Sequence, residues 1–200
     1  MKNNLKNNKY LFLVTVAFFG LAFINIHFAL LGIVCMTIPF VLLFRDGKKT
    51  WCSGYCPRAS LFTTLGTKWG RKGKKIPMSF IKGNVKNYVL GYFGIALFIT
   101  TMSTLRVARG GMPPLLYPRF LIFIPLNVNF PQLFELTMFA PWVTHLSFRL
   151  FSMMMTTTVF GLILSYLYKP RTWCTICPIS TLSGIYIMES KKKNSFAKVS

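Results

Sequence analysis

Residues 10–44 read YLFLVTVAFFGLAFINIHFALLGIVCMTIPFVLLF, a run of 35 positions without a charged side chain. One straight helix of this length would be about 50 Å long, whereas the hydrocarbon core of a bilayer is about 30 Å thick. Asn25 and His27 are the strongly polar residues near the middle of the run. We therefore expect two membrane helices, over residues 9–24 and 28–44, joined by a tight turn.

Two further apolar runs, over residues 87–105 and 149–168, are also near the length of a membrane span. Hydrophobic residues make up 53% of the 200-residue chain, more than is usual for a soluble domain. We therefore expect an all-α integral membrane protein of about four transmembrane helices, forming a single membrane domain over residues 1–200. Six prolines between residues 106 and 147 disfavour a fifth regular span there, so short interfacial helices or a re-entrant loop are expected.

The charge of the chain is strongly positive, with 24 Lys and Arg against 3 Asp and Glu and a net charge of +21. The basic residues lie between the apolar runs, which favours contact with an anionic lipid surface over nucleic-acid binding. With four spans, 20 basic residues fall on one side and only 4 on the other. The positive-inside rule then predicts a multi-pass protein of the bacterial inner membrane, with both termini and the long basic loop in the cytoplasm.

Two cysteine motifs form an internal repeat. Residues 50–61 (motif I) read TWCSGYCPRASL and residues 172–182 (motif II) read TWCTICPISTL. Each motif follows an expected membrane helix, opens with Thr-Trp-Cys and closes its cysteine pair with Cys-Pro. Since only two spans separate the motifs, they are expected on the same side of the membrane.

The paired cysteines are candidate metal ligands: Cys52, Cys56, Cys174 and Cys177. Two cysteines separated by two or three residues can direct their sulfurs to one centre, and two such pairs supply four thiolates. Three interpretations stay open on spacing alone: an iron-sulfur cluster, a structural zinc site that stabilises an adaptor, and a thiol-disulfide redox pair. A reducing cytoplasm disfavours stable disulfides.

The proline after each cysteine pair predicts a helix start. Pro57 and Pro178 suit the first helical position, which places Cys56 and Cys177 at the N-caps and predicts a short amphipathic helix after each motif. The helix dipole is expected to lower the pKa of a cysteine at that position. Basic residues flank the motifs and are expected to offset the negative charge of a bound cluster and raise its reduction potential, namely Lys48, Lys49, Arg58, Lys169 and Arg171.

The Cys-x-x-x-Cys-Pro and Cys-x-x-Cys-Pro elements, each preceded by Trp and a membrane helix, resemble those of bacterial 4Fe-4S binding membrane proteins. They are also similar to the membrane domains of the nitrous-oxide reductase maturation regulator and the quinol-oxidising membrane subunit of periplasmic nitrate reductase. The resemblance implies a 4Fe-4S cluster bound by the four paired cysteines. It also implies electron transfer at the cytoplasmic face, with a redox partner protein and with a quinone as a further candidate partner.

The remaining candidate side chains have simpler interpretations. Cys35 lies alone in an apolar run and is expected to be a packed apolar residue. His145 and His27 are expected to be structural. No nucleotide-binding loop or pair of catalytic carboxylates is present, so an electron-transfer component is expected rather than a stand-alone enzyme.

Overall fold

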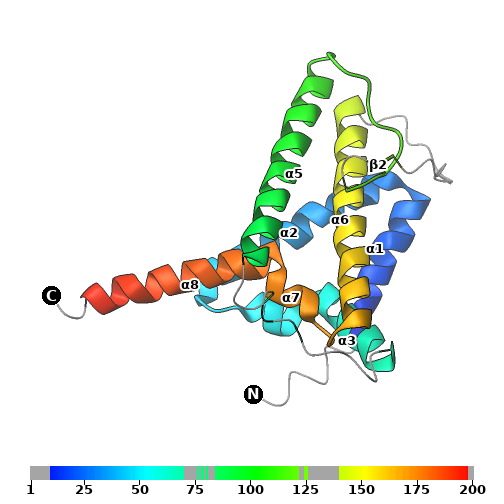
Figure 1. The fold of residues 1–200 in the computed structure, drawn as a ribbon. Coiled ribbons are helices and arrows are strands. Elements are labelled where there is room, and N and C mark those ends of the chain that lie inside the picture. The colour runs from blue at the N-terminus through cyan, green and yellow to red at the C-terminus, as the bar shows by residue number, and fades with distance from the viewer. Residues whose placement is uncertain are drawn as a thin grey trace.

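The computed structural model describes residues 10–69, 76, 78, 80, 84–121, 124, 125 and 140–197. These residues are mostly helical (Figure 1). In chain order the elements are α1 (Phe12–Ile24), η3 (Ile26–Leu30), α2 (Leu31–Asp46), η4 (Trp51–Tyr55), α3 (Pro57–Trp69), α5 (Val85–Ala108), β1 (Arg119–Phe120), β2 (Ile124–Pro125), α6 (Pro141–Leu167), α7 (Thr172–Ile176) and α8 (Pro178–Ala197).

The long apolar run breaks at Asn25, as the sequence predicts. Asn25 is extended, its side chain accepts a hydrogen bond from the backbone N–H of His27, and the chain resumes in η3 and α2. The Nε2 atom of His27 lies 3.3 Å from the hydroxyl of Thr144 in α6. The polar residues of the run therefore form its turn and tie that turn to the neighbouring helix.

Three helical stretches in the described part of the chain are long and apolar enough to cross a membrane: Ile26–Asp46, α5 and α6. They correspond to three of the four expected spans. The first expected span differs, because α1 has only 13 residues and is about 20 Å long, less than the hydrocarbon thickness. Residue 9 lies outside the described residues. The count of four spans stays a prediction.

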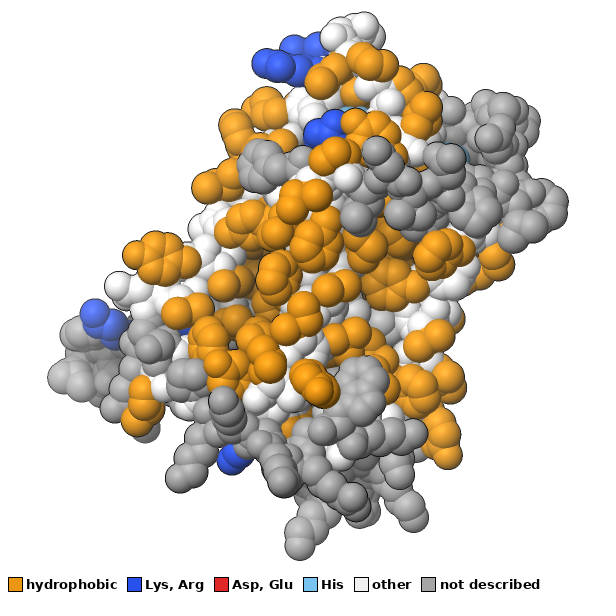
Figure 2. Space-filling view, turned by 45° about the vertical axis from the view of Figure 1, so that its right-hand side comes forward, with side chains coloured by type: hydrophobic (Ala, Val, Ile, Leu, Met, Phe, Trp, Pro, Cys, Tyr) orange, Lys and Arg blue, Asp and Glu red, His pale blue; other side chains and the backbone are white. Residues whose placement is uncertain are grey.

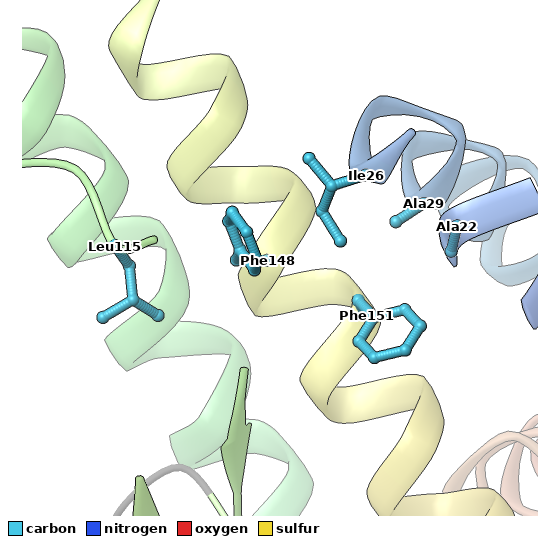
Figure 3. Close-up of a cluster of buried hydrophobic side chains, with 6 residues drawn as sticks. All are labelled: Ala22, Ile26, Ala29, Leu115, Phe148 and Phe151. Atoms are coloured by element: carbon cyan, nitrogen blue, oxygen red, sulfur yellow. The ribbon is translucent and has the colours of Figure 1, made fainter. Parts of the chain in front are cut away.

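Helix α6 is the central element of the fold. It contacts η3, α2, α3, α5 and α7, and Figure 1 shows it in yellow between α5 and α1. The small residues Ala22 and Ala29 let α1 and η3 approach α6 closely, where Phe148 and Phe151 are almost fully buried (Figure 3). This apolar contact fixes the first helical hairpin against α6.

The chain between α5 and α6 returns along α6 without forming a helix over residues 111–121. Its backbone N–H groups bond to α6 side chains: Leu115 donates to Nδ1 of His145 at 3.1 Å, and Arg119 donates to the hydroxyl of Ser152 at 2.9 Å. Irregular backbone at membrane depth requires such internal partners. The arrangement fits the expected re-entrant loop, and residues 126–139 lie outside the described part.

Large apolar side chains remain on the outside of the helices. Leu13, Val41, Ile95 and Phe98 are all more than half exposed. Figure 2 shows hydrophobic side chains over the middle of one face, where Lys and Arg are few. This surface is compatible with a lipid environment.

Candidate metal centre

Motif I and motif II form equivalent turns despite their different lengths. In motif I the N–H of Cys56 bonds to the carbonyl of Trp51, five residues back, at 3.0 Å. In motif II the N–H of Cys177 bonds to the carbonyl of Trp173, four residues back, at 2.9 Å. The extra residue of motif I is therefore absorbed by a π-helical turn, and in both motifs the second cysteine is tied to the tryptophan before the first.

The first residues of α3 and α8 agree with the sequence prediction. Cys56 and Cys177 have extended ψ angles, and their carbonyls accept the first helical bonds, from Ser60 at 3.2 Å and Thr181 at 2.9 Å. Pro57 and Pro178 begin α3 and α8. Helices therefore follow both motifs, but α8 has 20 residues and is not short. The amphipathic character of the two helices stays a prediction.

The four paired cysteines line one cavity of about 60 Å³. Its walls come from both motifs and from α2, α3, α5 and α6, and they include both Trp51 and Trp173. In Figure 1, α3 and α7 both lie at the lower end of the bundle, where α6 ends. The two motifs thus border one cavity, while their place on one membrane face and the role of each cysteine as a ligand stay predictions.

The pKa values of Cys52, Cys174 and Cys177 are raised rather than lowered. The pKa of Cys52 is raised to about 11 and that of Cys174 to about 12, first by burial and then by neighbouring thiols of both motifs. Burial also raises the pKa of Cys177, although the backbone N–H groups of Ser180 and Ile179 act in the opposite direction. The expected lowering by the helix N-terminus is therefore wrong for Cys177, because desolvation outweighs it. Metal binding at these thiols must release protons.

Four thiolates are a donor set suited to a tetrahedral zinc ion or to an iron-sulfur cluster. Tetrahedral zinc with Zn–S bonds of about 2.3 Å holds its sulfurs about 3.8 Å apart. Among the described residues, no three His, Cys, Asp or Glu side chains lie close enough to hold a single metal ion. The four thiols line the cavity between the motifs, and the described residues contain no preformed single-ion site there.

Arg58 supplies positive charge at the cavity. It follows the Cys-Pro of motif I, lines the cavity, and donates hydrogen bonds to the hydroxyl of Thr157 at 3.0 Å and to the sulfur of Met154. The guanidinium also acts to lower the pKa of Cys177. No carboxylate lines this cavity in the described residues, so the site is suited to a group with net negative charge.

Two basic side chains, Lys49 and Arg171, form hydrogen bonds between the segments that contain the two motifs. Lys49, three residues before Cys52, donates to the carbonyl of Ser180 in α8 at 3.0 Å. Arg171, three residues before Cys174, donates through Nε to the hydroxyl of Thr63 in α3 at 3.0 Å. The residue directly before each motif is thus hydrogen-bonded to the helix that begins in the other motif.

We expect the loss of these cross-links to loosen the site. Lys49→Gln and Arg171→Asn should each speed the loss of bound metal to a chelator about fivefold, since one such bond contributes about 1 kcal/mol. Asn is chosen because Arg171 has a positive φ of 68°, which Asn tolerates. Lys48→Gln, at an exposed position, is the matched control. Equal rates in all three variants would show that the cross-links do not stabilise the site.

Cys35 is placed differently from the sequence expectation. It is not isolated, because it lies on the wall of the same cavity as the four paired cysteines. It comes from α2, far from both motifs in sequence, and no spacing pattern pointed to it. All five cysteines lie among the described residues and are free thiols.

His145 is buried and hydrogen-bonded, and its structural role stays a prediction. His145 is 2% exposed, accepts from Leu115 and lies 3.0 Å from the hydroxyl of Ser103.

Residues 28–77 and 151–195 match the family model of a 4Fe-4S binding domain. The two segments make up nearly half of the chain and contain both cysteine motifs, Cys35 and Arg58. No curated protein and no solved structure matches the chain. The cofactor bound by this domain is a 4Fe-4S cluster.

Proposed function

We propose that the protein transfers electrons in the bacterial inner membrane and holds its cluster at the cytoplasmic face. The reason is that two segments of the chain match the model of a 4Fe-4S binding domain. Cys52, Cys56, Cys174 and Cys177 are the proposed ligands. The observation that carries the proposal is their convergence on one cavity, two from each motif. A bound 4Fe-4S cluster supplies one-electron redox chemistry.

The orientation rests on charge. The ends of the chain and the loop that contains motif I carry 20 of the 24 basic residues. The cysteine cavity lies at this end of the bundle, where α2 ends and α8 begins. A cluster there is accessible to a cytoplasmic partner protein, while the exposed apolar surface of the helices keeps the protein in lipid. The similarity to quinol-oxidising membrane subunits makes a quinone the proposed membrane-side partner.

Several residues of this chain would serve a bound cluster directly. Trp51 and Trp173 form part of the cavity wall and would limit the access of water. Arg58 contributes positive charge, and its bonds to Thr157 and Met154 fix the guanidinium against α6. The thiol-disulfide interpretation is the second candidate, because all the paired cysteines are free and share one cavity.

Anaerobic purification tests the proposal. We expect brown protein that contains iron and acid-labile sulfide in a one-to-one ratio and gives an electron paramagnetic resonance signal of a 4Fe-4S cluster after reduction. Colourless protein with stoichiometric zinc would contradict cluster binding. Metal-free protein whose cysteine pairs oxidise reversibly would support the thiol-disulfide function instead.

We expect Arg58 to set the reduction potential of the cluster. Arg58→Gln removes a positive charge at the cavity wall and should make the potential more negative, because the reduced cluster carries more negative charge and loses stabilisation. A potentiometric titration followed by electron paramagnetic resonance measures the change. Arg45→Gln is the control, since the Arg45 side chain is 79% exposed. A shift of equal size in both variants would mean that net charge, and not the position of Arg58, sets the potential.

A further inference from the structure

A second, larger cavity of about 480 Å³ lies between α5 and α6. Its walls are mainly apolar and include Phe93 of α5 and Phe160 and Ile163 of α6. Along α6 its lining runs from Arg149 to Leu164, about 22 Å at the rise of a helix. The volume is within the range of pockets that hold a small molecule.

Two arginines close one end of this cavity, Arg119 from β1 and Arg149 from α6. Arg149 is only 8% exposed, and its Nε and Nη1 atoms are buried without a hydrogen-bond partner. The Nε atom of Arg119 is buried in the same way, while its Nη2 atom donates to the hydroxyl of Tyr117 at 2.9 Å. Unpartnered buried guanidinium groups are costly, by several kcal/mol each.

The described residues supply no counter-charge to this pair. The only acids among them are Asp46, at the end of α2, and Glu189, in α8, and neither lines the cavity. The two guanidinium groups also repel each other. An anion from outside the described chain would remove both penalties, and the planar fork of arginine is matched to phosphate and carboxylate oxygens.

We propose that this cavity binds an anionic phospholipid, with its phosphate on Arg119 and Arg149 and an acyl chain between α5 and α6. Arg149 is eight residues from the start of α6, or about 12 Å, and α6 is about 40 Å long against a hydrocarbon core of about 30 Å. The arginines thus lie within reach of the headgroup region. The remaining length of the cavity is sufficient for an acyl chain, which occupies half of that core.

The two cavities share part of their walls, so a lipid in the larger cavity would border the metal centre. Phe93, Thr157, Trp173 and Pro178 line both the lipid cavity and the cysteine cavity. An acyl chain in the larger cavity would cover the outer side of Trp173 and exclude water from the wall of the metal centre. The proposal itself does not depend on electron transfer.

Native mass spectrometry of the purified holoprotein in detergent tests the lipid site. We expect phosphatidylglycerol to bind at least about tenfold more tightly than phosphatidylcholine. Arg149→Gln and Arg119→Gln should each remove this preference. Arg106→Gln, at an exposed position in the last turn of α5 on the same side, is the matched control and should retain it. The iron content of each variant shows that it is folded.

The proposal is overturned by equal affinity for the two lipids, by loss of the preference in Arg106→Gln, or by complete competition by inorganic phosphate at equal concentration. Preferential binding of oleate would assign the cavity to a fatty acid instead of a phospholipid. Glu135 lies outside the described residues, so Glu135→Gln is included. If that variant alone creates the lipid preference, the carboxylate of Glu135 neutralises the arginines in the native protein and the proposal is wrong.

Discussion

Cys52→Ala and Cys174→Ala should each abolish the visible absorption of the cluster. The reason is that the site is shared: both motifs line one cavity, and neither supplies more than two of the four thiols. A cluster with three remaining ligands should be lost during purification. The measurements are the iron and sulfide content per chain and the absorption spectrum of protein isolated without oxygen.

Cys35→Ala is the matched control for this experiment, since Cys35 lines the same cavity from α2. We expect full iron content in this variant, because its thiol belongs to neither motif. Loss of the cluster in Cys35→Ala, together with its retention in one of the variants of motif I or motif II, would replace a proposed ligand by Cys35. Loss in only one motif would show that the two motifs do not share a centre.

Gly161→Val is expected to destabilise the protein by about 3 kcal/mol, the upper part of the usual range for overpacking. A Cβ atom at Gly161 would overlap the ring of Phe62, which is 1% exposed at the contact between α3 and α6. The same contact includes a 2.9 Å hydrogen bond from the hydroxyl of Ser165 to the carbonyl of Phe62. Separation of these helices would move Cys56, at the start of α3, away from motif II. Thermal unfolding in detergent and iron retention both measure the effect.

A double variant separates this overlap from other causes. Phe62→Ala leaves space for the valine, so Gly161→Val should be much less harmful in that background than in the native one. Gly91→Ala in α5 is the control, because a Cβ atom there has nothing within 4 Å, and it should change stability by less than about 1 kcal/mol. Additive losses in the double variant would mean that the contact with Phe62 is not the cause.

The sequence predicted the helical fold well because each helix is specified by the residues within it. The uncharged run, its polar break at Asn25 and the two later apolar runs each correspond to an observed helix or turn. The start of α1 was not predictable in the same way, because residues 10–13 are apolar and give no signal for the first helical residue. The loop after α5 depends on bonds from Leu115 and Arg119 to α6, which no local pattern indicates.

For the candidate site, spacing found the four cysteines of the two motifs and their helix starts. It missed Cys35, whose place on the cavity wall depends on how α2 packs against the motifs. It also gave the wrong direction for the pKa of Cys177, because burial is a tertiary property. The cross-links made by Lys49 and Arg171 follow from the repeat only after both motifs are seen together.

Because of its π-helical turn, motif I holds one more residue than motif II and still keeps the hydrogen bond between its second cysteine and its tryptophan. Its added residue is accommodated on the outer side, where Ser53 is exposed and a side chain at Gly54 would meet open space. Deleting one of these two residues would give motif I the length of motif II and an ordinary helical turn in place of the wider one. Insertion and deletion at this point are thus routes by which the chain can change length while the tryptophan-to-cysteine bond keeps the thiol in place.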